Sequence, residues 1–281
     1  MNRSATPGPA RSDPSGAEPS DYLARVLERK REEIAALRPR EAEWRAIAAD
    51  LPPARPWARA LRRPRHVALI AEIKRRAPSA GELDRDLVPE ALAHTYERAG
   101  ASALSVLTDS DFDGELADLT RARNAVTIPA LRKDFILDPV QVWESRVAAA
   151  DAILLIVRAL DETRLSELLA VAGEAGLGAL VEVHDEEELS RAIASGAPVL
   201  GINNRDLRTL ATGLELTRRL SSAVPADRLL VAESGIESAE QVRDLGAHGV
   251  DAVLVGSALV RHAVPGCLAA ALAGQPRVPR P

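Results

Sequence analysis

Charged side chains end several short apolar runs of this chain, at points where a hydrophobic core would reject them. One run ends in Lys74, a second in Lys133 and a third in Glu182. Ammonium and carboxylate groups can exchange protons with a substrate when they are held close together. A single such residue is typical of a salt bridge at a strand end. Their repetition indicates acid–base chemistry, because burying many charges is costly unless they act together.

Strand alternation indicates which of these side chains share a face, since every second residue of a strand points the same way. By this parity Arg132 and Asp134 point outward, and His184, at the start of a turn, is predicted to be a cap or surface histidine. The residues that we expect to face one interior are Glu72 and Lys74, Leu131, Lys133 and Phe135, Leu180 and Glu182, and Asn203, Arg205 and Leu207.

Two later runs end in glycine and serine. Ser234 and Gly235 follow one run, and Gly256 and Ser257 follow the next, each just before a predicted helix. Glycine lets the backbone approach a ligand closely, and the start of a helix offers free N–H groups to an anion. Either pair alone is typical of a turn. Together they predict a phosphate site at Gly235, Gly256 and Ser257.

The apolar runs alternate with amphipathic stretches that carry acidic residues in front and glycine behind, as helices do. This alternation predicts an α/β protein with a closed (β/α)₈ TIM barrel, rather than an open doubly wound sheet. The carboxyl ends of the strands then form the active face. We expect strands near 67–74, 102–108, 127–133, 151–157, 178–183, 198–203, 228–233 and 252–256.

A helical extension precedes the barrel. Residues 1–20 are rich in Pro, Gly and Ser and are expected to be a disordered tail. A first helix is predicted from an N-cap at Asp21 to Pro39, and a second over 41–49, before a proline-rich stretch. We therefore expect residues 21–281 to form one TIM-barrel domain: an extension over 21–66, a barrel over 67–272 and a C-terminal tail over 273–281.

Composition narrows the function classes. A net charge of −5 argues against nucleic acid and anionic membranes as partners, and no apolar run approaches the length of a membrane span. The single cysteine, Cys267, favours a reducing cytoplasm. The five histidines lack the spacing of metal ligands, and neither a dinucleotide-binding motif nor a nucleophile elbow is present. We therefore predict chemistry that needs no metal and no cofactor.

The two phenylalanines, Phe112 and Phe135, both fall at the loop ends of predicted strands. In a chain with 2% aromatic residues, their position predicts the walls of a pocket for an aromatic ring.

Six segments, in this order, resemble the indole-3-glycerol-phosphate synthase family of tryptophan biosynthesis. They are AEIKRRAPS, LRKDFILDPVQVWESR, ALVEVHDEEEL, GINNRDL, VAESGI and VLVGSALV. The resemblance covers about residues 21–272. That family converts 1-(2-carboxyphenylamino)-1-deoxyribulose 5-phosphate into indole-3-glycerol phosphate, CO₂ and water, without metal or cofactor.

The resemblance implies a role for each matching residue. Lys133 would be the general acid of ring closure and Glu182 the general base of the later dehydration. Lys74, paired with Glu72, would position the substrate and its proton transfers. Further substrate contacts would come from Ser79, Phe112, Phe135, Asn203, Arg205, Leu207, Glu233 and Ser234, and phosphate contacts from Gly235, Gly256 and Ser257. Ala77 stands where the family usually has serine. The partner would be one small phosphorylated, carboxylated substrate, and we expect a monomer.

Other functions fit parts of the same pattern. The chain could be a copy specialised for another indole pathway. It could also be another phosphate-binding barrel, such as phosphoribosylanthranilate isomerase or an aldolase forming a Schiff base on Lys133. A binding barrel without catalysis would tolerate the loss of Lys133 and Glu182.

Overall fold

The computed structural model describes residues 19–77, 81–205 and 212–280. Of the predicted tail over 1–20, residues 1–18 lie outside the described residues, as do two predicted substrate contacts, Ser79 and Leu207. Residues 19 and 20 belong to a helix, so the predicted tail extends too far by these two residues.

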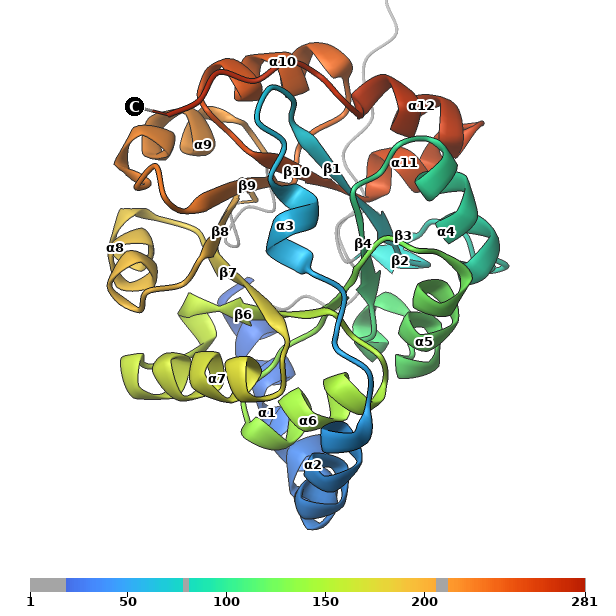
Figure 1. Ribbon diagram of the computed structural model, residues 1–281, viewed down its shortest axis with the longest axis vertical. Coiled ribbons are helices and arrows are strands. Elements are labelled where there is room, and N and C mark those ends of the chain that lie inside the picture. Colours follow the sequence, from blue (N-terminus) through green and yellow to red (C-terminus); the bar gives the residue numbers. More distant parts are fainter. Residues whose placement is uncertain (1–18, 78–80, 206–211, 281) are drawn as a thin grey trace, which may run out of the picture.

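Eight parallel strands of the described chain close into a barrel, which confirms the predicted TIM fold (Figure 1). All eight predicted strands are present, most of them shorter than predicted by a residue or more at their ends. They are β1 (Ala68–Ile73), β4 (Ala103–Leu107), β5 (Ala130–Lys133), β6 (Ala152–Ile156), β7 (Gly178–Val183), β8 (Val199–Asn203), β9 (Leu229–Glu233) and β10 (Ala252–Val255). The ring closes where Ala68 of β1 pairs with Ala252 of β10. A two-stranded hairpin of β2 (Arg76–Ala77) and β3 (Gly81–Glu82) follows β1.

A ring of helices surrounds the barrel (Figure 1). Polar N-caps start several of them; for example, Asp138 accepts the N–H of Val140, and Asp185 accepts that of Glu188. The helices are α4 (Pro89–Arg98), α5 (Leu116–Ala125), α6 (Pro139–Val147), α7 (Glu162–Glu174), α8 (Glu186–Ala194), α9 (Glu215–Leu220), α10 (Ala239–Ala247), α11 (Ser257–Arg261) and α12 (Pro265–Leu272). Short 3₁₀ turns are η1 (Arg38–Arg40), η2 (Ser110–Phe112), η3 (Val157–Ala159) and η4 (Ser221–Ala223).

The core has two layers, as strand alternation predicts. Inside the barrel lie residues such as Ile70, Leu131 and Leu180, whereas Leu104 and Ile153 pack outward against the helices. The inward parity predicted for Leu131 and Leu180 is therefore confirmed. Because alternation carries on to the strand ends, the same parity directs Lys133 and Glu182 into the barrel mouth.

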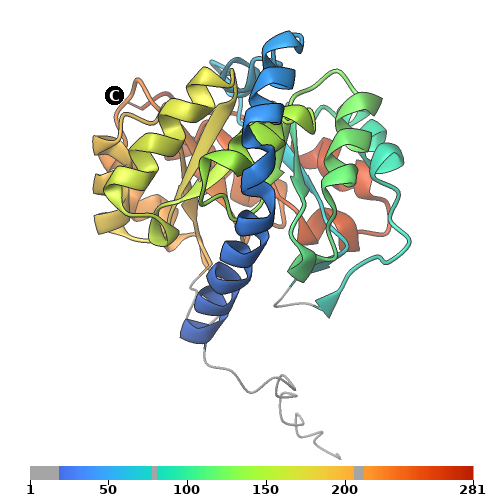
Figure 2. The ribbon, with the colours of Figure 1, turned by 90° about the horizontal axis from the view of Figure 1, so that it is seen from below.

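The N-terminal extension forms α1 (Pro19–Leu37), η1, α2 (Glu41–Asp50) and α3 (Trp57–Leu61). The predicted N-cap at Asp21 is wrong, because α1 already begins at Pro19. Proline is favoured in the first helical turn, which allows α1 to begin before Asp21. Figure 2 shows α1 along the side of the barrel, with its N-terminal end projecting beyond the strands.

A buried lysine fixes α1 to the barrel. Lys30 lies between Val26 and Ile34 on the buried stripe of the helix. Its Nζ is 2.8 Å from an oxygen of Asp109 and 2.7 Å from one of Asp134. Burial lowers the pKa of Lys30, but the two carboxylates outweigh this and hold it above its usual range. Asp134 thus points outward as predicted, and it connects the end of β5 to α1.

The short helix α3 closes the barrel at the end opposite the strand carboxyl termini, and it lies at the centre of the ring in Figure 1. Trp57 and Leu61 pack against the first residues of the strands, among them Ala68 and Ala252. Gly178 lies directly against the Trp57 ring, where any side chain would collide with it. The predicted proline-rich stretch therefore contains a structural plug.

The C-terminal residues pack against the same end. The Val67 N–H donates to the Gln275 carbonyl at 2.8 Å. Arg277 and Arg280 both pair with buried Asp251, at 2.6 and 2.9 Å. The residues predicted as a C-terminal tail thus pack against the end of the barrel where the strands begin.

We expect Trp57→Ala to lower the free energy of unfolding by about 3–5 kcal/mol, since it leaves a cavity under the strand starts. Trp57→Phe should lower it by less than half as much, because the ring still fills most of the space. Urea denaturation followed by circular dichroism measures both. A loss below about 1 kcal/mol for Trp57→Ala would show that α3 is not a plug.

Candidate active site

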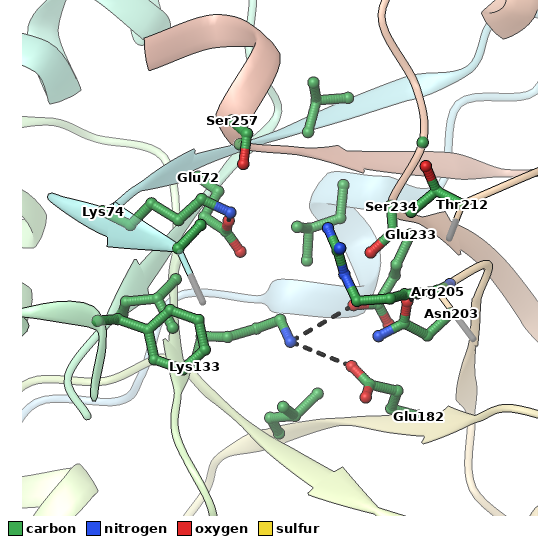
Figure 3. Close-up of a pocket in the computed structure, with 18 of the residues that line it drawn as sticks. Glu72, Lys74, Lys133, Glu182, Asn203, Arg205, Thr212, Glu233, Ser234 and Ser257 are labelled. Atoms are coloured by element: carbon green, nitrogen blue, oxygen red, sulfur yellow. Dashed lines mark hydrogen bonds and ion pairs between the residues drawn. The ribbon is translucent and has the colours of Figure 1, made fainter. Parts of the chain in front are cut away.

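A cavity of about 480 Å³ opens at the carboxyl ends of the strands. It is large enough for a small-molecule ligand. Of the predicted site residues within the described chain, all line this cavity: Glu72, Lys74, Phe112, Lys133, Phe135, Glu182, Asn203, Arg205, Glu233, Ser234, Gly235, Gly256 and Ser257. Figure 3 shows the polar ones pointing toward a common centre.

Lys133 stands at that centre. Its Nζ donates to Glu182 Oε2 at 3.1 Å and lies 3.7 Å from Glu233 Oε2 (Figure 3). Burial lowers the pKa of this lysine, but the surrounding carboxylates, led by Glu182 and Glu233, hold it above its usual range. Lys133 is therefore a charged ammonium that can give a proton to a substrate atom.

The two carboxyl groups beside Lys133 differ in protonation. Burial alone would raise the pKa of Glu182, but Lys133 and His184 hold it well below its usual range. For Glu233, burial and the negative charge of Glu182 hold the pKa well above its usual range. Carboxyl groups whose pKa values are driven apart in this way can serve as base and as proton holder.

Glu233 occupies a space that a glycine provides. Its Oε1 is buried without a hydrogen-bond partner among the described residues. A side chain at Gly201, on neighbouring β8, would collide with that oxygen. The Gly201 position therefore makes room for a third carboxyl group in the barrel mouth.

Glu72 and Lys74 form a close pair at the end of β1, with 2.5 Å between Glu72 Oε1 and Lys74 Nζ. Gly256, at the end of β10, faces this pair. A Cβ at position 256 would meet both the Glu72 carboxylate and the Lys74 ammonium. The absence of a side chain at Gly256 therefore leaves the space that the Glu72–Lys74 pair occupies, whether or not Gly256 also contacts a phosphate.

Asn203 is the last residue of β8 and Arg205 follows that strand, on the opposite side of the cavity from Glu72 and Lys74 (Figure 3). Asn203 Oδ1 accepts the backbone N–H of Arg205 at 3.1 Å, and Arg205 forms a β-bridge with Thr212. These contacts fix the position of Arg205 relative to Asn203 and Thr212. Asn203 and Arg205 both border the cavity, as predicted.

The glycine–serine pairs also reach the cavity. Ser234 and Gly235 both have positive φ, 65° and 76°, a conformation that is uncommon for serine. Such backbone often occurs at binding sites, where surrounding structure holds it in place. Ser257 is the first residue of α11 and lies across the cavity from Ser234 (Figure 3).

Helix α1 contributes cavity residues that sequence reasoning missed. Tyr22, Leu23 and Arg25 line the cavity together with Phe112 and Phe135. Nothing in their local pattern indicates this position, because it depends on how α1 docks. The only signal was Lys30, a lysine on an otherwise apolar helix stripe, which indicated buried acidic partners elsewhere in the fold.

The prediction that His184 is a cap or surface residue is wrong. Its side chain is only 4% exposed, and Nε2 lies 3.3 Å from Glu182 Oε1. Position 184 keeps the inward parity of Leu180 and Glu182 for one residue beyond the end of β7 at Val183. Extending the alternation by that residue would have found it.

Within the described residues, no cluster of three or more histidine, cysteine or acidic side chains is arranged to hold a metal ion. No helix in the same part of the chain is long and apolar enough to cross a membrane.

Two comparisons with known structures bear on the fold. The chain superimposes on 3-hexulose-6-phosphate synthase from Salmonella typhimurium with a TM-score of 0.56 and 17% identity, covering 73% of this chain and 96% of that one. Thiamine phosphate pyrophosphorylase from Pyrococcus furiosus gives a TM-score of 0.53 and 20% identity, covering 73% and 93%. At such low identity these likenesses show the barrel fold alone.

Sequence comparison is more specific. The family model for indole-3-glycerol phosphate synthase matches residues 23–266. An indole-3-glycerol phosphate synthase from Roseiflexus sp. (strain RS-1) is 50% identical over 249 residues, covering 85% of this chain and 93% of that protein. The match spans all eight strands of the barrel and most of α1, including every described residue of the cavity between Leu23 and Arg261. The chain therefore belongs to the indole-3-glycerol phosphate synthase family.

Proposed function

We propose that this chain catalyses the reaction for which its family is named. It closes the pyrrole ring of 1-(2-carboxyphenylamino)-1-deoxyribulose 5-phosphate and releases CO₂, water and indole-3-glycerol phosphate. The observation that carries the proposal is the contact of 3.1 Å between Lys133 Nζ and Glu182 Oε2 inside the cavity. An acid and a base in contact suit a reaction that needs a proton given early and one removed late.

Ring closure needs the acid. The ring carbon that bears the carboxylate attacks the ketone carbon, and the ketone oxygen gains negative charge as the new C–C bond forms. Lys133 donates a proton to that oxygen and leaves a hydroxyl group. The C–C bond to the carboxylate then breaks, CO₂ departs, and its electron pair restores the aromatic ring. A buried ammonium stabilises the developing charge strongly, because little water screens it.

Dehydration needs the base. The new hydroxyl group leaves as water after taking a proton, and the five-membered ring loses a proton to become an indole. Glu182 accepts that ring proton, because Lys133 and His184 keep its carboxylate ionised. Lys133, reprotonated, can assist the leaving hydroxyl. Glu233 keeps its proton, so it does not add a further negative charge beside the carboxylates of Glu182 and Glu72.

The substrate is anionic at both ends, and the cavity is lined by cations and by backbone of glycine residues that suit it. Lys74 and Arg205 lie on opposite sides of Lys133 and suit the carboxylate. The backbone at Gly235 and Gly256, with the Ser257 hydroxyl, suits the phosphate. Phe112 and Phe135 provide an apolar wall for the aromatic ring.

The charge state of Lys133 argues against the Schiff-base alternative. An aldolase lysine must be neutral to attack a carbonyl carbon, and its pKa is usually lowered for that purpose. Here the surrounding carboxylates raise the pKa of Lys133. Borohydride added with substrate should therefore not trap a covalent adduct.

The direct test is to mix purified protein with the carboxyphenylamino substrate and follow indole fluorescence together with CO₂ release. We expect both to appear in equal amounts. Fluorescence without CO₂, or no product at saturating substrate, would contradict the proposed function. An isomerase would release no CO₂.

We expect Lys133→Met to lower kcat by about 10²–10⁴-fold while the dissociation constant of the substrate changes by less than about fivefold. The lysine acts on charge that develops in the transition state, whereas phosphate and carboxylate contacts supply ground-state binding. Single-turnover kinetics and isothermal titration measure the two effects. A kcat loss below tenfold would assign the acid to another group, with Lys74 the first candidate.

The phosphate loops can be separated from the catalytic pair by two neighbouring substitutions. Ser257→Ala should raise KM by about tenfold with kcat nearly unchanged, since it removes one hydrogen bond to a charged ligand. Gly256→Ala should lower kcat by at least about tenfold, because its methyl group displaces Glu72 and Lys74. Steady-state kinetics of both variants decide this. If both variants raise KM to the same extent and leave kcat unchanged, Gly256 affects only phosphate binding.

We also propose that the enzyme acts as a monomer in a reducing cytoplasm, without metal or cofactor. Every charged group placed in the mechanism comes from one chain, so the site needs no second copy. Sedimentation velocity should give a mass of 30.0 kDa. A stable dimer would contradict the monomer prediction.

A further inference from the structure

We propose that His184 is a positioning residue for the reaction, and this rests on the proposed role of Glu182 as base. Held as an imidazolium between two carboxylates, His184 fixes the direction of the Glu182 carboxylate and keeps it ionised. Neither task requires contact between His184 and the reacting atoms.

Both ring nitrogens of His184 face carboxylates. Nε2 is buried without a hydrogen-bond partner among the described residues, but it lies 3.3 Å from Glu182 Oε1 as an ion-pair contact. Nδ1 lies 3.2 Å from Glu188 Oε2. A neutral imidazole carries only one N–H, so one nitrogen would then turn a lone pair toward a carboxylate. The arrangement therefore suits the doubly protonated ring.

The outer carboxylate is itself held in place. Glu188 Oε2 also accepts the backbone N–H of His184 at 2.7 Å. Glu188 Oε1 accepts Arg158 Nε at 2.5 Å, and the Asp185 side chain caps the Glu188 N–H at 2.9 Å. The imidazole ring is thus anchored to the start of α8, independently of Glu182.

The charges alternate from the outside of the barrel to its centre. Arg158 on η3 pairs with Glu188 on α8, and Lys133 on β5 pairs with Glu182 on β7. His184 completes this sequence between the two glutamates. Burial lowers the pKa of His184, but Glu182 and Glu188 outweigh burial and raise it to about 9. The imidazolium is therefore the main form at neutral pH.

This chain of charges has a consequence at high pH. Above about pH 9 His184 loses its proton, and Glu182 loses a partner on one side. The pKa of Lys133 lies higher still, so the alkaline loss of kcat should reflect His184 rather than the general acid. Because the folded-state pKa of His184 exceeds its unfolded value of 6.5, the stability that it contributes is complete below that pH and lost as pH rises through about 9.

The test is the pH dependence of kcat in variants that leave Glu182 and Lys133 in place. Glu188→Gln should move the alkaline limb down by about one pH unit or more, since it removes one of the carboxylates that raise the His184 pKa. His184→Phe keeps an aromatic ring, and it should lower kcat by about tenfold and abolish the limb near pH 9. KM should change by less than about twofold in both.

Glu187→Gln is the matched control, because it makes the same charge change at the adjacent residue. Glu187 is exposed, and the hydrogen bonds and ion pairs of His184 do not involve it. We expect Glu187→Gln to have the kcat of the wild type and the same alkaline limb in its pH profile. A general effect of lost negative charge on α8 would instead move both variants equally, and would overturn the proposal.

A second measurement does not depend on turnover. Histidine ¹⁵N NMR of the ligand-free protein should give one ring with a pKa of about 9, absent in His184→Phe and shifted down in Glu188→Gln. If the wild type forms no indole product, the proposed function fails, and a normal pKa for His184 would overturn the imidazolium as well. If the wild type is active but His184→Phe keeps its kcat and pH profile, only the positioning role of His184 is overturned.

Discussion

The barrel mouth is organised around one buried positive charge, the ammonium of Lys133. An ion in this position is tolerable only if opposite charges surround it. Glu182 supplies the nearest one, 3.1 Å from the ammonium, and Glu72 adds to the same field, while Glu233 Oε2 lies 3.7 Å away. Three negative charges close to one another would repel, so the pKa values of the carboxyl groups move in opposite directions. Glu182 stays ionised and Glu233 keeps its proton. The attraction between Lys133 and Glu182 therefore keeps the proposed acid protonated and the proposed base ionised.

The strand that presents Lys133 inward presents Asp134 outward, because successive side chains alternate. Asp134 then meets Lys30 of α1 and Arg132 of its own strand, with 2.7 and 3.0 Å between the charged atoms. The end of β5 is therefore held by compensated charges on both faces. This arrangement connects the N-terminal helix to the position of Lys133, and it places Tyr22 and Leu23 over the cavity. Lys30, Arg132 and Asp134 thus stabilise the end of the strand that carries Lys133.

The sequence was sufficient to predict the barrel, its eight strands and the inward parity of Glu72, Lys133 and Glu182, because these depend on local alternation. It was not sufficient for α3, since Trp57 and Leu61 follow prolines and their role depends on the barrel end that they fill. The cavity contacts of α1 depend on docking, which no local pattern encodes. His184 was within reach of the parity argument and was misassigned, because the strand was assumed to lose its alternation one residue early.

The mechanism depends on the protonation states in the barrel mouth, and neutron diffraction of the ligand-free protein, exchanged into D₂O near neutral pH, observes them directly. We expect deuterons on Lys133 Nζ in its full ammonium form, on the Glu233 carboxyl group and on both ring nitrogens of His184, with none on Glu182. A deuteron on Glu182, or a neutral amine at Lys133, would contradict the assignment of base and acid.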